Sequence, residues 1–134
     1  MTFEIHPQLR ADCFHLGELN NCTLLLHKNA LVHWFILVPH SHQTEIFKLA
    51  TDQQNTLQQT INRIASFVDT RFKTDKLNIA TIGNIVPQLH VHIIGRQIHD
   101  FCWPNPVWGQ TESAEYSAAQ VTDIQQLLIK DGLL

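Results

Sequence analysis

Two histidines two residues apart stand out in the apolar stretch PQLHVHIIGR, where His90 and His92 follow Gln88 in the same phase. Near neutral pH, imidazole can act as a nucleophile, a proton carrier or a metal ligand, so this spacing requires a chemical explanation. Side chains on a β-strand alternate between two faces and rise about 3.3 Å per residue. The pattern therefore predicts three polar side chains in a row on one face of a strand, with the intervening apolar residues in the core.

Three interpretations of this row are open. It can be a half-exposed strand whose polar residues face water. It can be a metal site, because two histidines at this spacing can converge on one ion; His33, His40 and His42 are then candidates for a third ligand. It can also perform nucleophilic attack at phosphorus, where one imidazole nitrogen attacks while a backbone carbonyl holds the other as a donor. No cysteine or carboxylate spacing supports the metal site, and we expect neither a metal nor a cofactor.

The composition narrows the class of protein. The chain has 134 residues, of which 44% are apolar and 16% charged, and its net charge is -3. These values predict a single globular domain over 1–134 without the basic stripe that a binder of polymeric nucleic acid needs. The three cysteines show no Cys-x-x-Cys spacing, no signal peptide is visible, and the apolar runs are too short to span a membrane. We therefore expect a cytoplasmic protein without membrane or nucleic-acid partners.

The periodicity of the apolar residues predicts the elements that position the histidines. Short runs rich in β-branched and aromatic residues indicate strands, and apolar residues at helical spacing after a capping-box pattern at Thr51 and Gln54 indicate a long helix. The segment 101–109 has two prolines and two tryptophans and is expected to be a structured loop. The predicted elements are strands over 13–19, 22–27 and 34–39, a long helix near 52–72, strands over 77–82 and 88–96, and a helix near 117–130. This order predicts an α+β domain with an antiparallel sheet of about five strands.

The stretch around the two histidines resembles the signature of the histidine triad (HIT) superfamily, His-φ-His-φ-His-φ-φ with φ apolar, except that Gln88 replaces the first histidine. GNIVP (83–87) resembles the family's lead-in and WFILVPHSH (34–42) its earlier strand, so the resemblance extends over about residues 20–96. The chain is most similar to a bacterial HIT-like group with a Gln-x-His-x-His triad and a Trp-Pro-x-Pro-Val-Trp-Gly segment, here 103–109. The resemblance implies a HIT-like α+β fold and a homodimer.

The resemblance also implies an activity. By position, His90 attacks the α-phosphate of a nucleotide to form a nucleotidyl-histidine, which water or another acceptor resolves, and His92 bonds a phosphoryl oxygen. Gln88 takes the position that normally assists with the phosphate and with the proton of the leaving group. The implied function is a nucleotide hydrolase or nucleotidyl transferase acting on dinucleoside polyphosphates or nucleoside phosphoramidates. Asn84 and Asn78 match positions where the family places amides or hydroxyls near the phosphate.

Other positions depart from the family pattern or leave their roles open. Arg96, at the end of the strand, is a candidate phosphate contact, although a solvent-facing position fits it equally well. Glutamine cannot act as a general acid near neutral pH, so a weak enzyme or a non-catalytic nucleotide-binding protein is the expected consequence.

A further family histidine aligns with Trp34, and His33 cannot replace it because a one-residue shift on a strand reverses the face. No acidic residue near 26–29 matches the family's ribose ligand. The residues expected to serve packing rather than base stacking are Trp34, Trp103 and Trp108.

Overall fold

The apolar runs of the first half of the chain form three neighbouring strands in the computed structural model, which describes residues 2–134. They are β1 (Cys13–Leu19), β2 (Cys22–His27) and β3 (His33–Pro39). The turn between β1 and β2 consists of Asn20 and Asn21, whose φ angles of 49° and 58° lie in the left-handed region that asparagine tolerates. A turn this short forces the two strands to run antiparallel.

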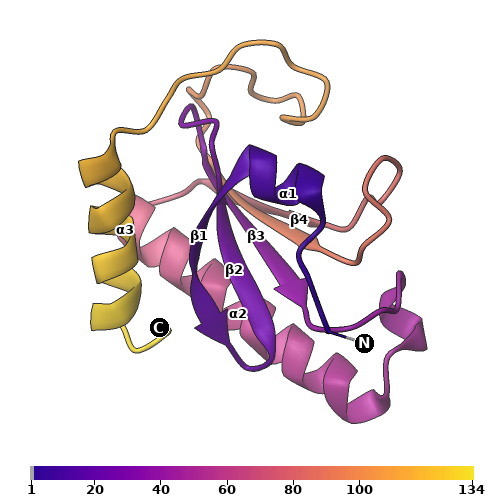
Figure 1. Cartoon of the computed structure of the whole chain (residues 1–134). Coiled ribbons are helices and arrows are strands. Elements are labelled where there is room, and N and C mark those ends of the chain that lie inside the picture. The colour runs from indigo at the N-terminus through magenta and orange to yellow at the C-terminus, as the bar shows by residue number, and fades with distance from the viewer. Residues whose placement is uncertain (1) are drawn as a thin grey trace.

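The second half of the chain completes the sheet. β5 (Val91–Arg96) pairs with β3, and β4 (Lys76–Ala80) pairs with the other side of β5. All neighbours are antiparallel, in the order β1-β2-β3-β5-β4 (Figure 1). The predicted α+β fold with about five antiparallel strands is confirmed.

Helices α2 (Thr51–Phe72) and α3 (Ala118–Lys130) cover one face of the sheet, where their apolar side chains join the larger of two hydrophobic clusters. Both helices match their predicted ranges closely. The predicted capping box at Thr51 is wrong by one residue, because Ala50 is the N-cap and its backbone N–H donates to the side chain of Gln53 at 3.1 Å. Within residues 2–134, no helix has the length and apolar character needed to cross a membrane.

The opposite face of the sheet carries the second hydrophobic cluster. It is covered by α1 (Pro7–Asp12) and by the loop over 101–109 (Figure 1). Leu9 of α1 and Val107 of the loop are each only 4% exposed, so the prediction of a structured loop is confirmed. The sequence analysis missed α1, because six residues are too few to show a helical period.

The strand that carries the histidines begins later than predicted. β5 starts at Val91, so Gln88 and His90 precede the strand. Continuing the β3–β5 register would place Leu89 opposite Pro39, and proline has no N–H to donate to a ladder. The predicted row of three polar side chains on one strand is therefore wrong, although the intervening apolar residues do lie in the core.

Candidate active site

His90 and His92 line one cavity of about 430 Å³ on the sheet face that α1 covers. Their ring centroids are 4.9 Å apart, and the two residues are 6% and 7% exposed. The structure thus brings the two histidines together, although only His92 lies on β5. The other polar and aromatic residues of this cavity that matter below are Gln8, Asp12, His27, Trp34, Asn84 and Trp108.

The imidazole of His90 is oriented by the backbone just before it. Its Nδ1 lies 2.7 Å from the carbonyl oxygen of Gln88. A carbonyl can only accept a hydrogen bond, so Nδ1 carries the proton and, in the neutral ring, Nε2 carries the lone pair. This is the arrangement that a nucleophilic histidine needs, and a strand ladder through residue 88 would have competed for the same carbonyl.

The imidazole of His92 is held by a tryptophan from β3. Trp34 Nε1 donates to His92 Nδ1 at 2.9 Å. In the sheet, Ile36 is the direct neighbour of His92, and Trp34 is two residues further along β3, within the diagonal reach of a large aromatic ring. Burial, together with the imidazoles of His90 and His27, lowers the pKa of His92 to about 3. His92 is therefore neutral at pH 7.

The indole of Trp34 is enclosed by other rings. His27 stacks on it with centroids 3.9 Å apart and planes 10° apart, and Trp108 meets it edge-on at 6.1 Å. The prediction that Trp34 is a packing residue holds but is incomplete, because it overlooks the N–H. His33 faces the other side of the sheet and stacks on Phe72 of α2 at 3.7 Å, as strand alternation predicts.

Gln88 does not lie among the residues that line the histidine cavity. Its side-chain Oε1 accepts a hydrogen bond from the backbone N–H of His6 at 2.9 Å, and its Nε2 donates to the carbonyl of Glu4 at 2.8 Å. One N–H of the amide remains for the smaller cavity of about 140 Å³ that Gln88 shares with His90. Gln88 therefore fastens the segment that leads into α1, a role that sequence spacing did not indicate.

The three predicted substrate-binding residues separate into two groups. Asn84 lines the histidine cavity. Arg96 is 1% exposed and donates to both carboxylate oxygens of Asp100, at 2.7 and 3.0 Å, and to the side chain of Asn78 at 3.0 Å. Neither Arg96 nor Asn78 lines the cavity, so their predicted contacts with substrate find no support in the geometry, and the solvent-facing alternative for Arg96 is also wrong.

The short helix α1 contributes polar residues that the sequence analysis missed. Asp12 is the one carboxylate among the residues that line the histidine cavity, and the side chain of Gln8 donates to it at 3.0 Å. His27, at the end of β2, lines the same cavity, in the 26–29 region where the sequence has no match for the family's acidic ribose ligand. No local pattern signals this arrangement, because α1 and β2 are brought together only by the fold.

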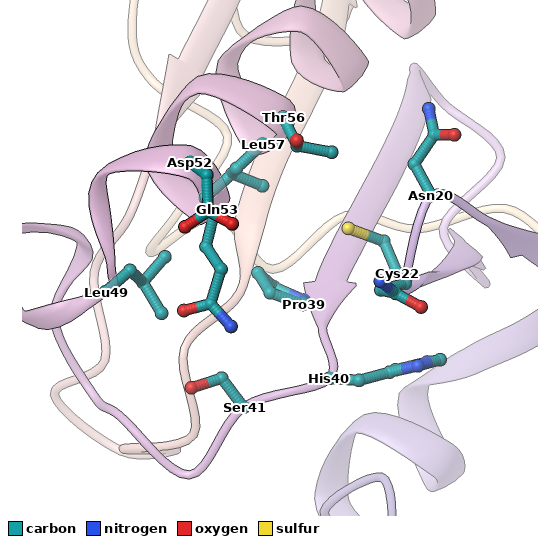
Figure 2. A pocket seen from close by; sticks show the side chains of 11 residues that line it. Asn20, Cys22, Pro39, His40, Ser41, Leu49, Asp52, Gln53, Thr56 and Leu57 are labelled. Atoms are coloured by element: carbon teal, nitrogen blue, oxygen red, sulfur yellow. The ribbon is translucent and has the colours of Figure 1, made fainter.

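A second cavity, of about 260 Å³, lies away from the histidines. Figure 2 shows it between the β1–β2 turn, the end of β3 and the first turn of α2, with Asn20, Cys22, His40 and Asp52 among its walls. Burial raises the pKa of the Cys22 thiol to about 11, so this cysteine is not a thiolate near neutral pH. None of the predicted site residues lines this cavity.

The metal interpretation lacks its third ligand. Across residues 2–134, no group of three or more histidine, cysteine, aspartate or glutamate side chains is placed to hold an ion. His33 points to the opposite face of the sheet from His92, and His40 contacts Glu18 and Thr23 instead. His27 also lines the cavity, but it stacks on Trp34 and is not placed with His90 and His92 to hold an ion.

Comparisons with known proteins identify the family and the fold. A family model of the HIT domain matches residues 8–99. A histidine triad protein from Bradyrhizobium japonicum has 38% identity and a TM-score of 0.92 over 96% of this chain and 97% of its own. Histidine triad proteins from Sinorhizobium meliloti (31% identity, TM-score 0.93, 97% of both chains) and Marinobacter aquaeolei (36%, 0.91, 96% and 95%) are also similar. No curated protein matches the sequence.

Proposed function

Because the chain belongs to the HIT domain family, we propose that it is a nucleotide hydrolase or nucleotidyl transferase that acts at an α-phosphate through His90. The observation that carries this proposal is the 2.7 Å hydrogen bond between His90 Nδ1 and the carbonyl of Gln88. It assigns the ring proton to Nδ1 and leaves the lone pair on Nε2, which is the form of imidazole that attacks phosphorus.

The reaction proceeds in two displacements. First, His90 Nε2 forms a bond to the α-phosphorus as the bond to the leaving group breaks, and the leaving group takes its proton from water because Gln88 has none to give. The hydrogen bond from Nδ1–H to the carbonyl stabilises the positive charge on the imidazole. Water then attacks phosphorus and loses a proton to solvent, the N–P bond breaks, and a nucleoside monophosphate leaves. In a transferase, another acceptor takes the place of water.

The histidine cavity suits a nucleoside. Its volume of about 430 Å³ lies within the usual range of small-molecule sites, and its walls are mainly apolar. Asp12 is placed to accept hydrogen bonds from ribose hydroxyls, which is the role that the resemblance gives to an acidic residue elsewhere in the chain. Asn84, which lines the same cavity, offers amide donors for the phosphate.

A non-catalytic nucleotide-binding protein is the alternative. It is favoured by the position of Gln88, whose side chain provides no acid and is engaged by the backbone of Glu4 and His6. A missing general acid lowers the rate by about 10²–10⁴. The lower rate would affect poor leaving groups most, so nucleoside phosphoramidates and dinucleoside polyphosphates provide a graded set of substrates.

The test compares turnover, covalent adduct and binding. Adenosine phosphoramidate and diadenosine polyphosphates are incubated with wild type, His90→Ala and His99→Ala, and the adduct is trapped by quenching. His99 is an exposed histidine outside the cavity and serves as the matched control. Wild type and His99→Ala should turn over substrate and form an adduct, whereas His90→Ala should lose at least about 10³-fold in kcat. Tight nucleotide binding without turnover or adduct would favour the alternative, and the absence of both would contradict the whole proposal.

A homodimer is a separate proposal that follows from the family resemblance. β4 lies at the edge of the sheet, and a free edge presents unpaired backbone groups to a second copy. Ile79 on this strand is 46% exposed. Sedimentation should give a mass twice that of the 15.4 kDa chain, and a monomer at micromolar concentration would contradict it.

A further inference from the structure

We infer that Trp34 is a positioning residue whose indole N–H holds His92 in the tautomer with the proton on Nε2, so that His92 can only donate toward a phosphoryl oxygen. The identity of the phosphoryl group rests on the proposed function, whereas the tautomer does not. At this position the family resemblance implies a histidine, and the sequence analysis assigned the tryptophan to packing alone.

The position of the proton follows from the 2.9 Å contact between Trp34 Nε1 and His92 Nδ1. An indole nitrogen is a donor only, so Nδ1 must present its lone pair to it. A neutral imidazole has one N–H, which is then on Nε2. The ring stays neutral at pH 7 because burial, with the nearby imidazoles of His90 and His27, lowers the pKa of His92 to about 3.

Trp34 is itself fixed in position. It is 6% exposed, with His27 stacked on one face and Trp108 against its edge. His27 is held in turn, because its Nδ1 accepts a hydrogen bond from the backbone N–H of Asn29 at 3.1 Å. In a close-packed interior, turning the indole away from His92 would require these rings to move together. The donor is therefore aligned before any ligand arrives.

The result is a pair of imidazoles in opposite tautomers. His90 carries its proton on Nδ1 and presents a lone pair on Nε2, while His92 presents a proton on Nε2. A phosphoryl group has an electrophilic phosphorus and anionic oxygens, which this pair complements. Because His92 cannot take up a second proton near pH 7, it cannot supply the general acid that Gln88 lacks.

The tautomer is tested by nitrogen-15 NMR of protein labelled in histidine and tryptophan, without nucleotide. Wild type should show His92 with a pyridine-like Nδ1 and a pyrrole-like Nε2 throughout the range in which free histidine titrates. A nitrogen–nitrogen coupling should connect Trp34 Nε1 with His92 Nδ1 across the hydrogen bond. Trp34→Phe keeps an aromatic ring but lacks the N–H, so the coupling should vanish and His92 should become a mixture of tautomers.

Trp108→Phe is the matched control for the NMR measurement. The ring of Trp108 lies 5.2 Å from that of His92, and its Nε1 has no hydrogen-bond partner among the described residues, so its replacement should leave the His92 tautomer unchanged. In the kinetic measurement with adenosine phosphoramidate, Trp34→Phe should lower kcat by about tenfold with little change in KM, because the His92 donor acts on charge in the transition state.

Three outcomes separate this inference from the proposed function. A protonated Nδ1 on His92 in wild type, or unchanged imidazole shifts in Trp34→Phe, would overturn the inference. If Trp34→Phe does not fold, the coupling in wild type decides alone, and its absence overturns the inference. If the tautomer is as expected but no nucleotide is bound or turned over, the proposed function fails while the role of Trp34 stands.

Discussion

The two ends of β5 both bury polar side chains, but they differ in how many hydrogen-bonding groups remain unused. At the far end, Arg96 engages Nε, Nη1 and Nη2 with Asp100 and Asn78. At the near end, His90 and His92 each use Nδ1 within the protein, and no side-chain or backbone partner of either Nε2 is found among residues 2–134. Burial alone does not distinguish the two clusters, because both are buried. Only the unused Nε2 atoms of the histidines indicate that this cluster binds a ligand.

The largest expected effect on stability is at the Arg96 end of β5, where the hydrogen-bonding groups are in use. Asp100→Ala should lower the free energy of unfolding by about 3–5 kcal/mol, because it leaves the guanidinium of Arg96 buried and unpaired. Urea denaturation followed by tryptophan fluorescence measures this. Asp123→Ala, which removes an exposed carboxylate that forms no ion pair within residues 2–134, should change stability by less than about 0.5 kcal/mol. A loss below about 1 kcal/mol for Asp100→Ala would show that the cluster is not structural.

At the histidine end of β5, we expect the free energy of unfolding to depend on pH through His92. Below pH 6.5 the unfolded chain takes up a proton at His92 that the folded chain takes up only near pH 3. The unfolded state therefore binds more protons, and the free energy of unfolding should fall by up to about 1.4 kcal/mol per pH unit as pH decreases from 6.5. His27 and His33 shift in the same direction, so the measured quantity is the difference between wild type and His92→Gln from about pH 7 to 4.5. Parallel curves for the two proteins would contradict the low pKa of His92.

Gln88 precedes the histidines in sequence but forms hydrogen bonds to the N-terminal segment, and we expect its replacement to have an intermediate effect. Gln88→Ala removes two hydrogen bonds to backbone groups, which should favour local opening of residues 4–12 by about 1–2 kcal/mol. Hydrogen exchange of those amides should accelerate while the exchange of β3 stays the same. Gln58→Ala, on the exposed surface of α2, is the control. Gln88→His should open the segment in the same way, and a protected segment in both variants would rule out the fastening role.

The two asparagines should give the smallest and most contrasting effects. Asn84→Ala should lower kcat/KM by about two- to tenfold without changing stability, as expected for one hydrogen bond to substrate. Asn78→Ala should leave binding unchanged but destabilise the fold by about 1 kcal/mol, because Arg96 loses a partner. Equal effects of the two variants on both quantities would remove the distinction between the ends of β5.

Local patterns in the sequence were enough for the sheet, the two longer helices and the pair of histidines. The periods of strands and helices are local, and the spacing of His90 and His92 places both near one strand. The capping box was misplaced by one residue because Thr51 and Ala50 are adjacent and helix ends are weakly encoded.

Partners far apart in the chain could not be predicted. The hydrogen bond from Trp34 to His92 joins residues 58 positions apart in the sequence. The hydrogen bonds between Gln88 and the N-terminal segment join residues more than 80 positions apart. A spacing rule assigns a side chain to a face but does not say which atom across the sheet will meet it. The placement of Arg96 failed differently, because its ion-pair partner Asp100 is only four residues away and lies beyond the end of β5, while Asn78 reaches it from β4.

The fastening of residues 4–6 by Gln88 also bears on how long a ligand stays bound. These residues lead into α1, whose residues Gln8, Leu9 and Asp12 line the histidine cavity, so we expect movement of α1 to release a bound nucleotide while the sheet stays intact. The two hydrogen bonds between the Gln88 amide and the backbone of Glu4 and His6 should break far more readily than the ladder between β3 and β5. We therefore expect product residence time to follow the opening of the N-terminal segment, with Gln88→Ala releasing nucleoside monophosphate faster than wild type in stopped-flow measurements. Gln88, at the position where the family signature has its first histidine, would then control the rate of product release rather than the chemical step.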